Sequence, residues 1–557
     1  MPKIGEILIQ KRLITPQQLE RAYKESQRTG EIIGRTLIKM GLITEAQLLS
    51  VLGEQLGLEF YPDLSKIPIS KEVIKAVPAR FVWHYKFMPL KLEANTLTVA
   101  ISDPLAVWPM EDLKLHLGYE VERILATEEQ ILSTIKKYYG LGAETVEEIL
   151  EKDKEAKESI KVKEEEIEDL ERKAQDASVI KLVNEIFLEA ISSSATDIHF
   201  EVYRDKVRVR YRIDGILYDM QLPEEVKYLY SAIVSRIKIL SKLNIIERRL
   251  PQDGRAIVKI QDKQVDLRIS VVPSIYGENV VIRILPMRLL FALGDLGFFP
   301  EDLKIIEELL SKPHGIVFLT GPTGSGKTTT LYAFLNRLNK EGVKIITIED
   351  PAEYELPGIV QVQAKPEIGL SFASCLRSIL RHDPDIMMVG EVRDLETAEL
   401  AIRTALTGHL IFSTLHTNDA PSGITRLLDI GIEPYLVASS VNAFISQRLV
   451  RKICSSCKEE VKDEDIFIQN LKGKKIFHGK GCKECKFTGY KGRTAIYEIF
   501  LLNDKIRELI LQKASATQIK NIAKKIGFRT LKEAGIRKVE MGITSVEEVI
   551  RVTELEE

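Results

Sequence analysis

The stretch GPTGSGKTTT at residues 321–330 constrains the fold of this chain more than any other part of the sequence. It lies between the apolar run GIVFLT and the segment LYAFLNRLNK, whose apolar residues recur at helical spacing. A complete GxxxxGK[ST] pattern between a strand and a helix is typical of a phosphate-binding loop, because its glycines let successive backbone N–H groups point at phosphate oxygens. The stretch therefore predicts a nucleotide site at the end of a strand in an α/β sheet.

The same loop predicts ATP and Mg²⁺ as cofactors. Lys327 is expected to reach the β- and γ-phosphates, and the Thr328 hydroxyl is expected to bind magnesium. The residues expected to hold the nucleotide are Gly321, Pro322, Thr323, Gly324, Ser325, Gly326, Lys327, Thr328 and Thr329.

Two further apolar runs end in carboxylates, which a phosphate-loop enzyme needs near the γ-phosphate to activate water. The run IITIEDPAEY contains Glu349 and Glu353, and DIMMVGEVRD contains Glu391. We expect Glu391 to orient or deprotonate the attacking water, and Glu353 to polarise that water or to support Mg²⁺. The alternative is that these acids only cap the helices that follow.

Two histidines bracket the next buried-strand run, in the segment TGHLIFSTLHTNDA. His409 precedes the run, and His416 lies at its carboxyl end, where α/β proteins gather ligands. His416 is expected to contact the γ-phosphate or Glu391 and so to report the state of the nucleotide. The alternative for both is a structural histidine hydrogen-bonded to backbone, and it is the favoured interpretation for His409.

Four of the five cysteines form two CxxC pairs, Cys454 with Cys457 and Cys482 with Cys485. Four thiolates in two chelating turns favour tetrahedral Zn²⁺ with no open position, so the predicted role is structural. Disulfides are the alternative, which a reducing compartment disfavours. The lone Cys375 is interpreted as a small core residue.

The rest of the chain divides by repeat, charge and period. Residues 4–19 and 33–48 repeat each other with a shift of 29, and residues 1–140 are expected to form an N-terminal regulatory or docking domain of helical repeats followed by an α+β unit. Residues 141–176 are mostly charged and predict a solvated linker. Period-two segments such as KVRVRYRI predict an α+β domain at 177–290, and alternating strands and helices predict an α/β domain at 291–557, with a cysteine insertion at about 450–490.

The composition argues against two classes of protein. The formal net charge is −2 for 557 residues, so direct nucleic-acid binding is not expected. No run approaches the roughly 18 apolar residues of a membrane span, and the start MPKIGEILIQ lacks the layout of a signal peptide. We expect a cytoplasmic protein that reaches a membrane through partners.

With the phosphate loop, the motifs TIEDPAEY, VGEVRD and TGHLIFSTLHTNDA, in this order, make the chain resemble the secretion ATPases of type II secretion systems and type IV pili. SSATDIHFE, RLPQDGR and LVRKICSSC extend the resemblance over roughly residues 177–557. The resemblance implies a RecA-like ATPase domain, a preceding PAS-like α+β domain and a homohexameric ring. In that family the four ATPase motifs are called the Walker A loop, Asp box, Walker B and His box.

The family resemblance also implies that arginines of the preceding domain reach a neighbouring subunit's nucleotide. The best matches are Arg268 in VDLRIS and Arg283 in VVIRIL, with Arg255 as a weaker third candidate. A guanidinium can neutralise charge that develops on a transferred phosphoryl group. A solvated arginine on a strand face remains the alternative.

The tetracysteine insertion and the long N-terminal region resemble assembly-type members of the family. We therefore expect a hexameric motor that powers type IV pilus assembly through an inner-membrane platform protein or its cytoplasmic adaptor, and so acts indirectly on pilins. Type II secretion is the alternative, and a DNA-translocating ring is the third. The N-terminal repeat resembles domains that bind cyclic di-GMP in some members, and protein docking is its other interpretation.

Overall fold

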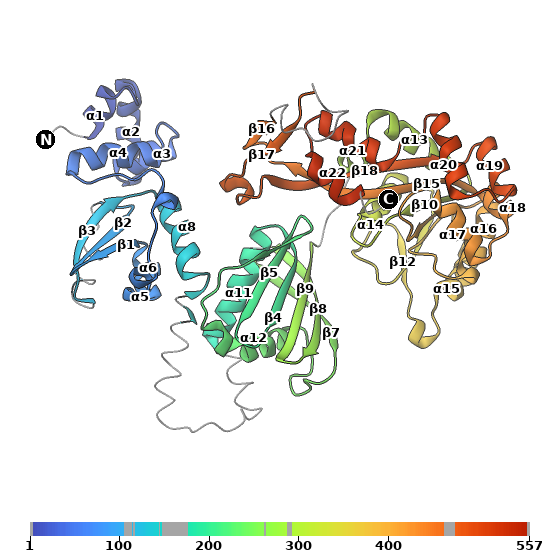
Figure 1. Ribbon diagram of the computed structural model, residues 1–557, viewed down its shortest axis with the longest axis horizontal. Coiled ribbons are helices and arrows are strands. Elements are labelled where there is room, and N and C mark those ends of the chain that lie inside the picture. The colour runs from blue at the N-terminus through green and yellow to red at the C-terminus, as the bar shows by residue number, and fades with distance from the viewer. Residues whose placement is uncertain are drawn as a thin grey trace. The chain divides into compact units, whose positions relative to one another are not determined.

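A computed structural model describes residues 4–104, 114, 117–143, 145–146, 176–260, 263–286, 292–461 and 474–553. The chain forms two compact units, Met1–Ile284 and Leu285–Glu557, which are described separately (Figure 1). Most of the charged linker expected at residues 141–176 lies outside the described residues. Within the described part of the chain, no helix is both long and apolar enough to cross a bilayer.

The first unit opens with four helices that follow the sequence repeat. They are α1 (Ile4–Gln10), α2 (Pro16–Thr29), α3 (Ile33–Lys39) and α4 (Glu45–Leu56). Both α2 and α4 begin with a capping box, in which a threonine at the N-cap and a glutamine at the third helical position exchange hydrogen bonds with each other's backbone. The two sequence copies therefore form the same helical pair twice.

Two glycines of the repeat lie where paired helices pack closely against each other. A Cβ at Gly5 would lie 2.7 Å from a Leu19 methyl carbon, and one at Gly34 would lie 3.0 Å from the matching carbon of Leu48. Each glycine thus allows the first helix of its pair to approach the second closely, which explains why glycine and leucine recur together in the two copies.

An α+β segment follows the four helices. A three-stranded sheet has the order β1 (Met88–Glu93), β2 (Thr96–Ile101), β3 (Glu120–Leu125). Strands β1 and β2 form an antiparallel hairpin, and β2 and β3 are parallel. The remaining elements are η1 (Leu64–Lys66), α5 (Lys71–Ala76), α6 (Ala79–Tyr85) and α8 (Glu128–Tyr139).

The last part of the first unit is a six-stranded sheet in the order β6-β5-β4-β9-β8-β7, with α11 (Ala177–Ser192) and α12 (Val226–Leu240) packed on one face. The alternation expected for KVRVRYRI is present, since Val209 and Tyr211 are buried against the helices and the arginines lie on the other face. The strands are β4 (Ala195–Val202), β5 (Val207–Ile213), β6 (Ile216–Asp219), β7 (Gln252–Ile260), β8 (Lys263–Ser274) and β9 (Gly277–Pro286).

The second unit is built on a seven-stranded sheet in the order β12-β11-β13-β14-β10-β15-β18. All neighbours are parallel except β15 and β18, which form a long antiparallel pair at one edge. The strands are β10 (Gly315–Thr320), β11 (Ile345–Glu349), β12 (Val360–Gln363), β13 (Ile386–Val389), β14 (Leu410–Leu415), β15 (Val441–Ile453) and β18 (Tyr490–Leu501).

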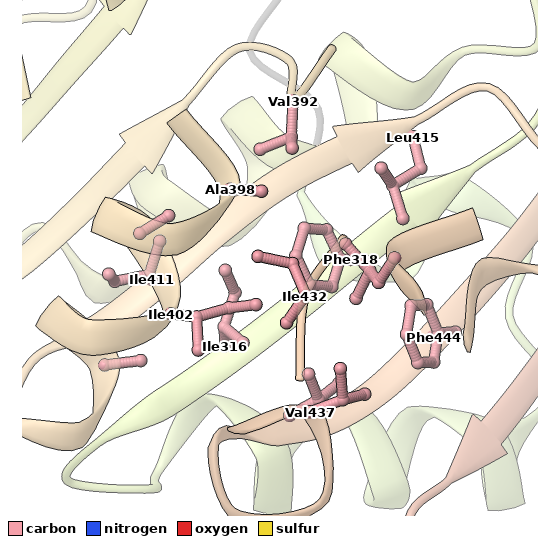
Figure 2. Close-up of a cluster of buried hydrophobic side chains, with 14 of the residues drawn as sticks. Ile316, Phe318, Val392, Ala398, Ile402, Ile411, Leu415, Ile432, Val437 and Phe444 are labelled. Carbon is pink, nitrogen blue, oxygen red and sulfur yellow. The ribbon is translucent and has the colours of Figure 1, made fainter. Parts of the chain in front are cut away.

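Helices cover both faces of this sheet, as a buried parallel sheet requires. Alternate residues of β10 enter opposite cores: Ile316 and Phe318 pack with α15–α20, and Val317 and Leu319 pack with α13 and α14. Figure 2 shows part of the first of these cores, where Phe318 and Phe444 stack with ring centroids 5.5 Å apart. The two cores fix the strand ends that carry the candidate site.

The remaining helices and short elements of the second unit lie around this sheet. They are η2 (Leu293–Leu296), α13 (Pro300–Leu310), α14 (Lys327–Leu338), η3 (Pro366–Ile368), α15 (Phe372–Ile379), η4 (Leu380–His382), α16 (Leu395–Leu406), α17 (Ser422–Ile430), α18 (Pro434–Ser440), β16 (Lys458–Glu460), β17 (Phe477–Gly479), η7 (Lys483–Cys485), α19 (Asp504–Leu511), α20 (Ala516–Lys525), α21 (Leu531–Glu540) and α22 (Val546–Thr553).

Candidate ATP site and cysteine cluster

The phosphate loop joins the buried strand β10 to the start of α14. The backbone φ angles of Gly321, Gly324 and Gly326 are 142°, 79° and 90°. These lie in the positive-φ half of the Ramachandran map, which residues other than glycine rarely adopt. At Gly321 a Cβ would also lie 2.7 Å from the Gln447 carbonyl oxygen. The sequence therefore folds into a tight curl whose following helix begins at Lys327 with its N–H groups unpaired by helical bonds.

Lys327 lies at the inside of this curl. Its Nζ donates hydrogen bonds to the carbonyl oxygens of Gly321 at 2.7 Å and Pro322 at 3.1 Å. Burial and, to a smaller extent, the nearby Arg448 lower the pKa of Lys327 to about 8, against the opposing effect of Glu391. A triphosphate in the loop would replace two neutral carbonyl partners by anionic ones, which stabilises the charged lysine.

Glu391 and His416 meet at the carboxyl ends of the neighbouring strands β13 and β14. The Nε2 atom of His416 lies 3.5 Å from one Glu391 carboxylate oxygen, and an Arg393 nitrogen lies 2.8 Å from the other. The Glu391 side chain is 15% exposed, and that of His416 is 48% exposed. The structure thus places His416 beside Glu391, one of the two contacts expected for it.

The two strand ends are tied together by one backbone hydrogen bond and one side-chain hydrogen bond. The Val392 N–H donates to the Thr414 carbonyl at 3.1 Å, and the Thr414 hydroxyl donates to the Gly390 carbonyl at 2.7 Å. At Gly390 a Cβ would lie 3.1 Å from the Ile348 carbonyl oxygen, so the strand end leaves little room for a side chain at the position before Glu391.

The two acids after β11 behave differently. Glu349 is almost fully buried and accepts hydrogen bonds from the Tyr332 hydroxyl, the Thr347 hydroxyl at 2.6 Å and the Gln361 side-chain amide at 3.0 Å. Its carboxylate therefore ties β11 to β12 and to α14. Glu353 follows in the loop, where its N–H donates to the Tyr332 hydroxyl at 3.2 Å.

The other sequence candidates lie elsewhere. The Nδ1 atom of His409 is 3.1 Å from the Thr404 carbonyl, which matches the structural interpretation favoured for that histidine. Arg268 and Arg283 lie in the first unit, on β8 and β9, and the Nε of Arg283 donates to Asp197 at 3.2 Å. Arg255 pairs with Asp266 at 2.7 Å.

Sequence reasoning missed Gln447 and Arg448, which adjoin the phosphate loop from β15. Gln447 Nε2 donates to the Ser325 carbonyl at 2.8 Å, and an Arg448 nitrogen lies 3.1 Å from where a Gly321 Cβ would be. The signal was present: in the apolar run VNAFISQRLV, an amide and a cation stand in the middle of a buried strand, where such groups need specific partners.

The four paired cysteines form a cluster at the end of the β15–β18 pair. Their sulfur atoms all lie within 4.8 Å of one another, and Cys454–Cys482, Cys457–Cys485 and Cys482–Cys485 are 3.8, 3.7 and 3.7 Å apart. A tetrahedral zinc site with Zn–S bonds of about 2.3 Å has S···S edges of about 3.8 Å. The cysteines fit that ion, and these distances are too long for disulfides.

The surrounding backbone supports a thiolate. The N–H groups of Cys482 and Gly489 donate to the Cys485 sulfur at 3.1 and 3.2 Å. Burial would raise the pKa of the Cys485 thiol, but these hydrogen bonds, together with those of the Cys482 and Cys457 side chains, outweigh it and bring the pKa to about 6. Cys375, in contrast, is a buried residue of the core on α15.

Comparisons with known proteins agree with this arrangement. The family model described as "Type II/IV secretion system protein" matches residues 141–551, and the MshEN domain matches residues 56–145. The "Type IV pilus assembly ATPase PilB" of Myxococcus xanthus is 42% identical over 558 residues, covering 98% of each chain. The "Type II secretion system protein E" of Xanthomonas campestris is 40% identical over 565 residues, covering 99% of this chain and 98% of that one.

A solved structure gives the same fold for the larger part of the chain. The Legionella pneumophila ATPase DotB aligns with a TM-score of 0.50 at 20% identity, covering 67% of this chain and 95% of that one. At this identity the likeness concerns the fold alone.

Proposed function

The chain belongs to the type II/IV secretion system protein family, and from this premise we propose that it is the motor that powers type IV pilus assembly. It is an ATP-hydrolysing P-loop enzyme. The observation that carries the proposal is the juxtaposition of a complete phosphate loop with the Glu391–His416 pair, in a chain 42% identical over 98% of its length to a pilus assembly ATPase.

We assign the steps of hydrolysis to residues as follows. The loop from Gly321 to Thr329 holds the phosphates, and Lys327 exchanges its two carbonyl partners for phosphate oxygens. Glu391 orients or deprotonates the attacking water, and His416 responds to the nucleotide through Glu391. Glu353 is the second carboxylate, set in position by the bond from its N–H to Tyr332.

We propose two metal ions, one for the chemistry and one for the fold. The Thr328 hydroxyl would bind Mg²⁺, with Glu353 as a supporting carboxylate, because both offer the hard oxygen ligands that this ion prefers. When bound, Mg²⁺ would neutralise negative charge on the phosphates. Cys454, Cys457, Cys482 and Cys485 would hold Zn²⁺ in a purely structural site.

We further propose that the working form is a homohexamer in which Arg268 and Arg283 complete a neighbouring subunit's site. The family resemblance supports this, together with the position of both arginines on the strands of the α+β domain, which we propose to be PAS-like. The bond of Arg283 to Asp197 would hold its guanidinium in one orientation until a phosphate competes for it.

The N-terminal domain is proposed as a docking domain for an inner-membrane platform protein or its cytoplasmic adaptor, through which pilins are reached indirectly. Cyclic di-GMP is the other occupant considered. Leu19 and Leu48 pack against Gly5 and Gly34, so packing between helices already accounts for these glycines without a ligand, which favours docking. We place the motor at the cytoplasmic face of the membrane, where ATP is available.

Type II secretion is the second candidate, and the specific observation in its favour is the 40% identity to a type II secretion protein over 99% of this chain. A DNA-translocating ring is least favoured, since the net charge of −2 gives no general attraction to phosphate backbones. Restoring pili in a host that lacks its pilus assembly ATPase would favour the first candidate, and restoring only protein secretion would favour the second.

The enzymatic core of the proposal is tested with Glu391→Gln. We expect ATP turnover to fall by at least about a hundredfold, because the water loses its base while the shape of the site is kept. Glu399→Gln is the matched control, since Glu399 pairs with Arg403 on the exposed side of α16. The rate of phosphate release from ATP is measured for both variants. Full turnover by Glu391→Gln would contradict the assignment.

A further inference from the structure

Strand β15 continues past the point where its parallel neighbour β10 stops, and two polar residues lie on the continuation. The last pair in the register joins Thr320 to Ser446, and Gln447 and Arg448 come next. Gln447 and Arg448 are only 2% and 7% exposed. Successive side chains of a strand point to opposite faces of the sheet, so the two have separate surroundings.

Gln447 binds the phosphate loop to the helix that follows it. Its Nε2 donates to the Ser325 carbonyl at 2.8 Å, and its Oε1 accepts from the Thr330 hydroxyl at 2.8 Å. This side chain therefore fixes the shape of the loop itself.

Arg448 binds a second loop, the segment from His416 to Ala420. One guanidinium nitrogen donates to the Asn418 carbonyl at 2.7 Å, and the other donates to the Gln447 carbonyl at 3.1 Å. The Ser446 hydroxyl also donates to the Asn418 carbonyl, at 3.2 Å. The nitrogen that reaches Gln447 is the one beside Gly321, so Arg448 lies between the phosphate loop and the loop that carries His416.

We propose that Arg448 is a positioning residue for ATP hydrolysis, which holds the loop of His416 at a fixed place relative to the phosphate loop and so keeps His416 beside Glu391. The inference rests on the proposed function of that site. Arginine suits the task because its planar fork donates in two fixed directions, whereas a lysine ammonium would satisfy one carbonyl and leave the other. Arg448 acts through His416, two residues before the carbonyl that it holds.

The test compares Arg448→Gln and Arg448→Lys in the full chain, with Arg451→Gln as the matched control. Arg451 lies three residues further along β15, is 12% exposed and pairs with Glu548 on α22. We expect Arg448→Gln to lower kcat at least about tenfold with KM changed less than about threefold, because a small misplacement of reacting groups costs rate more than binding. Arg448→Lys should regain part of kcat, and Arg451→Gln should lower Tm without lowering kcat.

A double variant separates positioning from general destabilisation. If Arg448 acts through His416, Arg448→Gln added to His416→Ala should lower kcat less than about twofold further. Three results would each overturn the inference. The first is a double variant in which the two kcat losses multiply, and the second is a wild-type kcat in Arg448→Gln. The third is an equal loss of kcat in Arg448→Gln and Arg451→Gln.

If Arg448→Gln yields no folded protein, Ser446→Ala carries the test, since it removes the second donor to the Asn418 carbonyl. Its kcat should fall about threefold in a folded chain, and an unchanged kcat overturns the inference.

Loss of turnover in Glu391→Gln combined with normal turnover in Arg448→Gln overturns this inference alone. Normal turnover in Glu391→Gln instead overturns the proposed catalytic function.

Discussion

Glu498 is a buried carboxyl that joins three segments of the second unit. It lies on β18 with 1% exposure, and its two oxygens accept from the N–H of Ala420 at 2.8 Å and of Leu531 at 3.0 Å. Ala420 ends the loop of His416, and Leu531 begins α21. Burial raises the pKa of Glu498 to about 7, although both backbone hydrogen bonds oppose the rise.

This pKa predicts how stability depends on pH. The unfolded chain titrates near the ordinary value of 4.5, so between that pH and about 7 the native state holds more protons and its stability falls as pH rises. The full effect is on the order of 3 kcal/mol. Thermal unfolding should therefore show wild type losing its advantage over Glu498→Gln between about pH 5 and 8.

Glu508→Gln, on an exposed position of α19, serves as the control and should track wild type at every pH. A constant difference in stability between wild type and Glu498→Gln across this range would show that Glu498 does not titrate there.

At the residue scale, the sequence predicted site residues that lie within a continuous motif. It missed the residues that reach the same site from a distant strand. The pattern around Lys327 and Glu391 is continuous in the chain, so spacing alone located both. Arg448 lies far from either in sequence, and only the pairing of β10 with β15 brings it to the loop. Glu349 could not be told from Glu353 by spacing, because burial against Tyr332 separates their environments.

At the element scale, the cysteine cluster lies at the end of the β15–β18 pair. Cys454 follows the last residue of β15, and its N–H donates to the Gly489 carbonyl just before β18. We expect Cys482→Ser to lose the proposed zinc and to expose the chain around the four cysteines to protease, since closed thiolate sites supply folding free energy directly. Zinc content per chain and the rate of limited proteolysis measure both effects.

Cys375→Ser is the matched control, because Cys375 is a buried cysteine outside the cluster and should leave the zinc content unchanged. Full zinc retention by Cys482→Ser would contradict the four-thiolate site.

Elements with a strong local signal were predicted well. The helices of the repeat have the matching caps Thr15 and Thr44, and the strands before the phosphate loop and the acids are mostly apolar and buried throughout. The order of the strands in the sheet was not accessible, because it depends on contacts between segments distant in sequence.

At the scale of the whole molecule, the proposed shared site makes a prediction about mixtures. Lys327→Ala and the double variant Arg268→Ala/Arg283→Ala should each be inactive alone. In mixed rings, an intact loop from the second variant can meet intact arginines from the first. About a quarter of random neighbours in an equal mixture have the productive order, so ATP turnover should reappear on mixing.

Asp197→Asn tests whether Arg283 matters only for its ion pair, because it removes that partner and keeps the arginine. Activity equal to wild type in the double arginine variant, or no activity in the mixture, would contradict the shared site. The domain boundaries expected from changes of period and charge stay a prediction, and the meeting of neighbouring subunits is inferred only from the family resemblance.

Strand β15 has a mechanical consequence beyond its hydrogen bonds. From Gln447 to Ile453 it runs about 20 Å beyond the edge of the phosphate loop, at roughly 3.3 Å per residue. As a lever of that length, it would turn a tilt of about 10° at the loop into a swing of roughly 3–4 Å at the cysteine tip.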